Sequence, residues 1–66
     1  MKAIMVDNMV VSLEQMKSAE IAKYNTRNYN IHIEYHSGKF TNVGYGTEEE
    51  MKKLLCVIYE KYTSES

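Results

Sequence analysis

Both histidines of the chain lie in one short stretch, NIHIEYHSGKF, with a carboxylate between them: His32, Glu34 and His36. Imidazole and carboxylate groups are common metal ligands and acid–base catalysts. On an extended strand, however, residues i and i+4 are about 13 Å apart, whereas zinc–nitrogen bonds measure about 2.0–2.1 Å. The two histidines therefore do not converge on one metal ion. We predict no metal site and no acid–base site in this stretch.

Two other patterns that could support chemistry also favour a structural interpretation. Gly44 and Gly46 precede a predicted helix whose first turn carries three glutamates, Glu48–Glu50, and these would repel a phosphate at the helix N-terminus. We expect these glycines to let the chain turn, with Gly44 also leaving room for a helix side chain. Cys56 lies in the middle of the same helix, away from the groups that activate thiols. We predict no catalytic residue and no cofactor, and hence a protein that is not an enzyme.

The residues between the histidines predict a strand. Apolar Tyr29, Ile31, Ile33 and Tyr35 alternate with polar residues, which is typical of a half-buried strand. Ser37-Gly38 fits a two-residue hairpin loop. The expected register places four pairs opposite each other: His36 and Lys39, Tyr35 and Phe40, Glu34 and Thr41, and His32 and Val43. Phe40 would then belong to the core face, and Val43 and Tyr45 to the histidine face.

A C-terminal helix is predicted after Thr47. Thr47 and Glu50 have the spacing of a capping box, in which the N-cap side chain and the Glu bond to each other's backbone amides. The apolar residues of the helix repeat at helical spacing and form one stripe: Met51, Leu54, Leu55, Ile58 and Tyr62. Cys56 and Val57 fall outside the stripe. Their apolar character indicates a helix that is covered on more than one side.

The N-terminal part predicts a hairpin, Lys2–Val6 and Met9–Leu13, around an Asp7-Asn8 turn. Residues 13–24 fit a helix and a strand almost equally, and we favour one turn at LEQM followed by a strand over Ser18–Tyr24. The expected fold is α+β, a small antiparallel β-meander of four to five strands with one C-terminal α-helix packed on one face. Residues 1–62 form this single domain, and residues 63–66 form a frayed tail.

Size and composition point to association. A chain of 66 residues buries only about 60% of the surface that its unfolded form exposes. Such small domains usually depend on a disulfide, a metal or a partner, and one cysteine makes no intrachain disulfide. A formal net charge of −1 provides no positive field for nucleic acid. The sequence predicts no membrane-spanning segment and no signal peptide, and the lone cysteine fits the cytoplasm.

We therefore expect a small protein–protein interaction module that forms a homodimer or binds another protein, and that acts as a regulator or inhibitor. The interface residues that we predict come from the histidine face and the helix: His32, Glu34, His36, Val43, Tyr45, Cys56 and Val57. The alternative is a nucleic-acid-binding module that uses the exposed sheet face around Lys39 and Tyr45.

Overall fold

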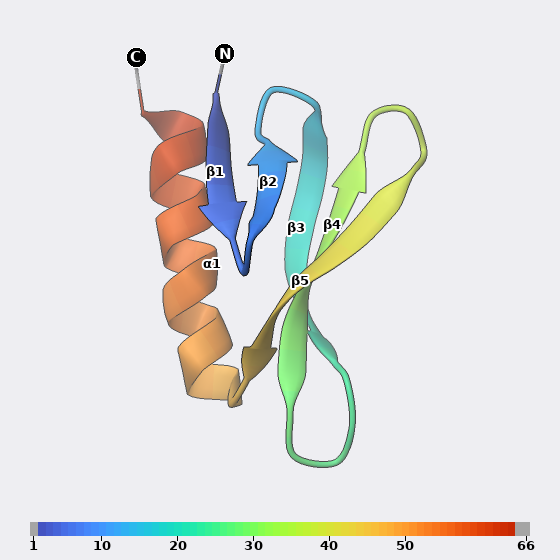
Figure 1. Ribbon diagram of the computed structural model, residues 1–66, viewed down its shortest axis with the longest axis vertical. Helices are drawn as coiled ribbons and strands as arrows, with labels where there is room; N and C mark the ends of the chain where they lie inside the picture. The colour runs from blue at the N-terminus through green and yellow to red at the C-terminus, as the bar shows by residue number, and fades with distance from the viewer. Residues whose placement is uncertain (1, 65–66) are drawn as a thin grey trace.

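A computed structural model describes residues 2–64 as five strands followed by one helix. In chain order these are β1 (Ala3–Val6), β2 (Met9–Ser12), β3 (Met16–Lys23), β4 (Tyr29–Tyr35), β5 (Phe40–Gly46) and α1 (Glu48–Thr63). The α+β class is confirmed. The single meander is not, because the strands divide into a two-stranded sheet, β1-β2, and a three-stranded sheet, β3-β4-β5 (Figure 1).

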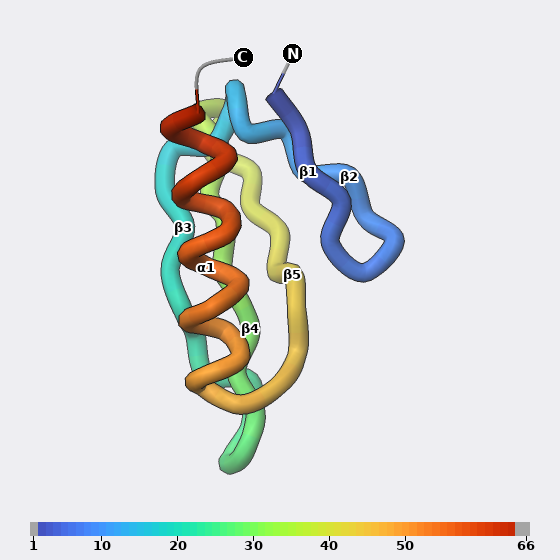
Figure 2. The backbone as a smooth tube through the Cα atoms, turned by 90° about the vertical axis from the view of Figure 1, so that its left-hand side faces the viewer, coloured from blue at the N-terminus to red at the C-terminus, as the bar shows by residue number. Residues whose placement is uncertain are grey.

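The hairpin β1-β2 turns where the sequence predicts. Asp7 and Asn8 have φ angles of 49° and 65°, and two consecutive positive φ values are the mark of a type I′ turn, which suits the twist of a hairpin. The hairpin stands beside β5 (Figure 2), where the Thr41 hydroxyl approaches the sulfur of Met9 at 3.7 Å. It buries Val6 and Val11 in the common core.

Residues 13–24 form a turn and a strand, so the strand alternative is correct. Leu13 accepts a hydrogen bond from the amide of Met16 at 3.3 Å, closing the turn. Strand β3 begins at Met16, two residues earlier than predicted, and its pairing with β4 shifts by one residue between Met16 and Ser18. Lys17 is therefore the extra residue of a bulge at the start of β3.

The predicted register of β4 and β5 is wrong by one residue. The amide of Gly38 donates to the Tyr35 carbonyl at 2.9 Å, and the amide of Tyr35 donates to the Lys39 carbonyl at 2.8 Å. These bonds, with Gly38 at φ 91°, define a three-residue loop that ends in a bulge. A shift of one residue exchanges the two faces of a strand. Phe40 is therefore 63% exposed, and Val43 is only 3% exposed, in the core.

A second bulge bends β5 towards the helix. Val43 pairs with Ile31, but Gly46 pairs with Tyr29, so one extra residue lies between them. Gly44 has φ 81°, and a Cβ atom there would lie 2.8 Å from Cδ2 of Leu54. Gly44 thus leaves room for a helix side chain, as the sequence suggests, although its neighbours across the sheet differ from those predicted.

Helix α1 packs on one face of the three-stranded sheet (Figure 2). The capping box is confirmed: the Thr47 hydroxyl accepts from the Glu50 amide at 3.2 Å, and Glu50 accepts from the Thr47 amide at 2.9 Å. The fully buried side chains of the common core include Val11, Leu13, Ile31, Ile33 and Ile58. Burial of each contributes about 1.5–3 kcal/mol relative to exposure.

The end of the helix differs from the expected tail. Thr63 is helical, and its hydroxyl donates to the Tyr59 carbonyl at 3.0 Å, so the helix continues one residue past the predicted boundary. Residues 65–66 of the predicted tail lie outside the described residues. Cys56 is exposed and Val57 is 44% exposed, so residues 2–64 do not supply the second cover that the sequence indicated.

Candidate protein-interaction surfaces

Strand β3 forms an open edge of the three-stranded sheet. In the described residues 2–64 it pairs with β4 alone (Figure 1). The opposite edge strand, β5, has the β1-β2 hairpin beside it (Figure 2). The amide of Tyr24 donates to the Asn28 carbonyl at 2.9 Å, directly beyond the end of β3 and the start of β4. Because antiparallel pairs alternate between bonded and non-bonded residues, Ala19, Ile21 and Lys23 direct their backbone groups to the free edge. These groups can pair with another strand.

A groove of about 500 Å³ lies between this edge and the helix. Its lining is largely apolar: Met16, Lys17, Ser18, Ala19, Leu55, Cys56, Ile58, Tyr59 and Tyr62. Ile58 is 1% exposed, whereas Tyr59 at the rim is 66% exposed. Pockets for small ligands generally combine apolar walls with a few converging polar groups. Here most of the lining is apolar, which suits the side chains of a protein partner.

The second surface is the outer face of the sheet, on the side away from the helix. His32 pairs with Asn42 across β4 and β5, and its Nδ1 lies 2.9 Å from Asn42 Oδ1. The imidazole ring also lies 5.1 Å from the ring of Phe40, with a 34° tilt. Glu34 stands directly opposite Phe40. The corrected register therefore gathers His32, Glu34 and Phe40 on one face.

A pair of tyrosines occupies the other end of this face. The rings of Tyr24 and Tyr45 meet edge to face at 5.3 Å, and the Asn28 side-chain amide donates to the Tyr45 hydroxyl at 2.9 Å. Both rings are about three-fifths exposed. Asn30, on the same stretch of β4, is only 8% exposed. The tyrosine pair is thus held in place at one end while its rings remain open to solvent.

A third exposed apolar group belongs to the β1-β2 hairpin. Met5 and Val10 are directly opposite each other and are 72% and 68% exposed. The pair is a single cross-strand contact on a short hairpin. It contributes apolar surface without the groove and the free backbone edge that accompany β3.

The structure divides the predicted interface residues among different surfaces. His32 and Glu34 lie together on the outer face, and Tyr45 lies at its far end. His36 belongs to the β4–β5 loop, and Val43 is in the core. Cys56 lines the groove, whereas Val57 is absent from its lining.

Several surface residues were missed by the sequence analysis. Tyr59 lies three residues after Cys56, and that spacing places both on one side of a helix. The spacing of Cys56 and Tyr59 could therefore have identified this part of the groove from the sequence. Ala19 and Phe40 could be identified as surface residues only from the strand order and the register of the sheet.

Within residues 2–64, no three or more His, Cys, Asp or Glu side chains come together in a way that would hold a metal ion. The described part of the chain also has no helix with the length and apolar character needed to cross a membrane. No family model, curated protein or solved structure matches the chain.

Proposed function

We propose that this chain is a non-enzymatic protein-interaction module that forms a homodimer through β3 and the groove beside it. The observation that carries the proposal is that two features suited to binding a partner lie next to each other. A strand edge with free backbone groups borders an apolar groove on the same side of the molecule. Addition of a strand to such an edge is a common mode of recognition, in which backbone bonds supply affinity and side-chain pockets supply specificity.

A second copy of β3 fits this edge in one favourable antiparallel register. Pairing centred on Ala19 places Ile21 of each copy opposite Lys17 of the other, on the helix side where the groove is. Glu20 then faces Ser18 of the other copy. Because the arrangement is symmetric, each copy receives Ile21 from the other, as an isologous interface requires.

Charge disfavours the neighbouring register. Pairing centred on Glu20 would oppose two Glu20 carboxylates and would place Lys17 opposite Lys23. Like charges directly opposite each other destabilise a strand pair. Pairing centred on Ile21 would instead bring Lys23 to the apolar groove. Ala19, whose side chain is small, also allows the two strands and their helices to approach closely at the axis.

The same features support the need for a partner, the cytoplasmic location and the role of a regulator or inhibitor. An unpaired, partly apolar edge promotes aggregation unless it is covered, and a small domain gains stability from a partner. A cytoplasmic location suits Cys56, which is exposed as a free thiol. A regulator or inhibitor that acts by binding another protein fits a small domain of this kind.

Neighbouring helix residues provide a matched test of the dimer. Cys56→Glu places a charge in the groove, and Val57→Glu places the same charge at an exposed position outside its lining. We expect sedimentation equilibrium to give twice the 7.7 kDa chain mass for the wild type and for Val57→Glu, and a monomer for Cys56→Glu. Circular dichroism confirms that both variants fold. A monomeric wild type at micromolar concentration would refute the proposal.

Nucleic-acid binding by the outer face is the weaker alternative. The corrected register adds Phe40 to Tyr45 and His32, so this face has more aromatic rings than the sequence predicts. Single-strand binding surfaces combine such rings with cations that follow the backbone. Here Glu20 and Glu34 point to the same face, and Lys39 lies in the loop beyond it. The alternative requires salt-dependent binding that weakens when Lys39 or Tyr45 is replaced.

A further inference from the structure

The part of the outer face near the β4–β5 loop combines two carboxylates with an exposed aromatic ring. Glu34 stands between Ser18 on β3 and Phe40 on β5, and Glu20 stands opposite His32. Directly opposite residues on antiparallel strands have Cβ atoms about 4.5–5.5 Å apart, and diagonal neighbours are about 7–8 Å apart. Glu34 is therefore within reach of a side chain that lies on the ring of Phe40, and Glu20, the diagonal neighbour of Glu34, adds a second negative charge nearby.

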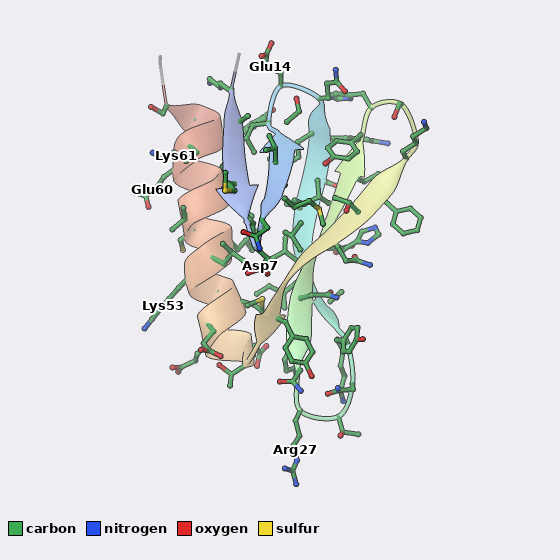
Figure 3. All side chains as sticks on the ribbon, in the orientation of Figure 1. Asp7, Glu14, Arg27, Lys53, Glu60 and Lys61 are labelled. Atoms are coloured by element: carbon green, nitrogen blue, oxygen red, sulfur yellow. The ribbon has the colours of Figure 1, made fainter. Side chains whose placement is uncertain are left out.

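Neither carboxylate has a partner among the described residues. Within residues 2–64, no side-chain hydrogen bond or ion pair involves Glu20 or Glu34. The alternation of β3 turns the Lys23 side chain to the helix face. Arg27 extends away from the sheet at the tip of the β3–β4 loop (Figure 3), and Lys39 lies in the β4–β5 loop, directly before Phe40. Glu20 and Glu34 thus place two unpaired negative charges on this part of the face.

The aromatic group beside these carboxylates is held in position yet open. Asn42 contacts the His32 ring at 2.9 Å, and that ring lies against Phe40. Phe40 remains 63% exposed. The small side chains of Ser18 and Ala22 flank Glu20 on β3 and leave its carboxylate accessible.

We propose that the outer face of the β3-β4-β5 sheet binds an arginine side chain from a basic segment of a partner protein. A guanidinium is planar, so it can stack on the Phe40 ring while its N–H groups pair with a carboxylate. Lysine offers a point charge without the planar fork. Glu20 and Glu34 would repel the phosphates of a nucleic acid at the same place, which favours a cationic peptide. This surface faces away from the groove, and Glu34 and Phe40 lie on β4 and β5, outside the proposed pairing of β3. Only Glu20 borders the other copy in the proposed dimer.

Titration with hexa-arginine, followed by amide NMR shifts, tests the proposal, with hexa-lysine as the charge-matched probe. We expect the largest shifts at Glu20, His32, Glu34 and Phe40. Hexa-arginine should bind about threefold more tightly than hexa-lysine because exposed cation–π contacts are modest. Phe40→Leu should remove this preference. Glu34→Gln should weaken binding of both peptides roughly two- to fivefold, as expected for exposed ion pairs.

Controls separate this site from general charge attraction. Glu49→Gln removes the same charge from the first turn of α1 and should leave the affinity unchanged. Glu20→Gln, at an exposed position, provides a second test if Glu34→Gln perturbs the fold. Equal affinity for the two peptides, or largest shifts at Glu48–Glu50, would overturn the proposal. So would oligothymidine that shifts the outer-face amides more strongly than hexa-arginine.

Discussion

The imidazole ring of His32 lies 5.1 Å from the ring of Phe40. The two residues are diagonal neighbours, because His32 pairs with Asn42 and Glu34 pairs with Phe40. This relationship places an aromatic ring on the outer face and leaves the core position to Val43. The stabilities of variants at Phe40 and at Val43 therefore show which register the hairpin adopts.

Phe40→Ala should cost less than about 1 kcal/mol, since the side chain is mostly exposed. Val43→Ala should cost about 2 kcal/mol, because it removes buried methyl groups and leaves a cavity. Urea denaturation measures both values. In the register expected from the sequence the order would be reversed, so a larger loss for Phe40→Ala would contradict the structure.

Gly44→Ala should destabilise the fold more than Gly38→Ala. Both glycines have positive φ, which costs a residue with a Cβ about 1–2 kcal/mol. Only at Gly44 would the new Cβ also meet helix side chains, at 2.8 Å from Leu54. Overpacking of this kind adds about 1 kcal/mol or more. Adding Leu54→Ala should recover part of that difference, and strictly additive effects in the double variant would show that Leu54 does not restrict this position.

Thr47→Ala should cost about 1 kcal/mol, because the helix loses the hydroxyl that accepts the Glu50 amide. Thr63→Ala is the matched control at the other end of α1, where the hydroxyl only donates back to helix carbonyls. Thermal or urea unfolding compares the two. A similar loss of unfolding free energy for both variants would mean that the Thr47 cap stabilises the fold no more than the Thr63 hydroxyl does.

Charges on different apolar surfaces should affect association differently. Tyr59→Glu alters the rim of the groove and should produce a monomer. Val10→Lys alters the exposed Met5–Val10 pair and should leave the dimer intact. Light scattering at micromolar concentration measures the mass of each variant. Dissociation by Val10→Lys alone would place the interface on the β1-β2 hairpin instead of β3.

Local patterns in the sequence predict several elements correctly. The alternation from Tyr29 to Tyr35 identifies β4, Asp7-Asn8 identifies the turn of the β1-β2 hairpin, and Thr47 with Glu50 identifies the start of α1. Each signal depends on residues close together in the chain. These elements account for the α+β class and for the helix on one face of the sheet.

The register and the surfaces depend on information that local patterns lack. Gly38 supplies a positive φ in both a two-residue and a three-residue loop, so Ser37-Gly38 does not decide between them. The bulge around Gly44 then allows Val43 and Tyr45 to face opposite sides, whereas strict alternation puts them on one side. The groove needs the further knowledge that β3 is an edge strand.

The central claim, a homodimer paired through β3, is tested most directly by an isotope-filtered NOE experiment on a mixture of labelled and unlabelled chains. Pairing centred on Ala19 makes Ser18 and Glu20 of the two copies a non-hydrogen-bonded pair, whose α-carbons approach closely. The account predicts an intermolecular NOE between the α-protons of Ser18 and Glu20. The absence of any intermolecular NOE to β3 at a concentration where the chain is dimeric, or a monomeric chain, would contradict it.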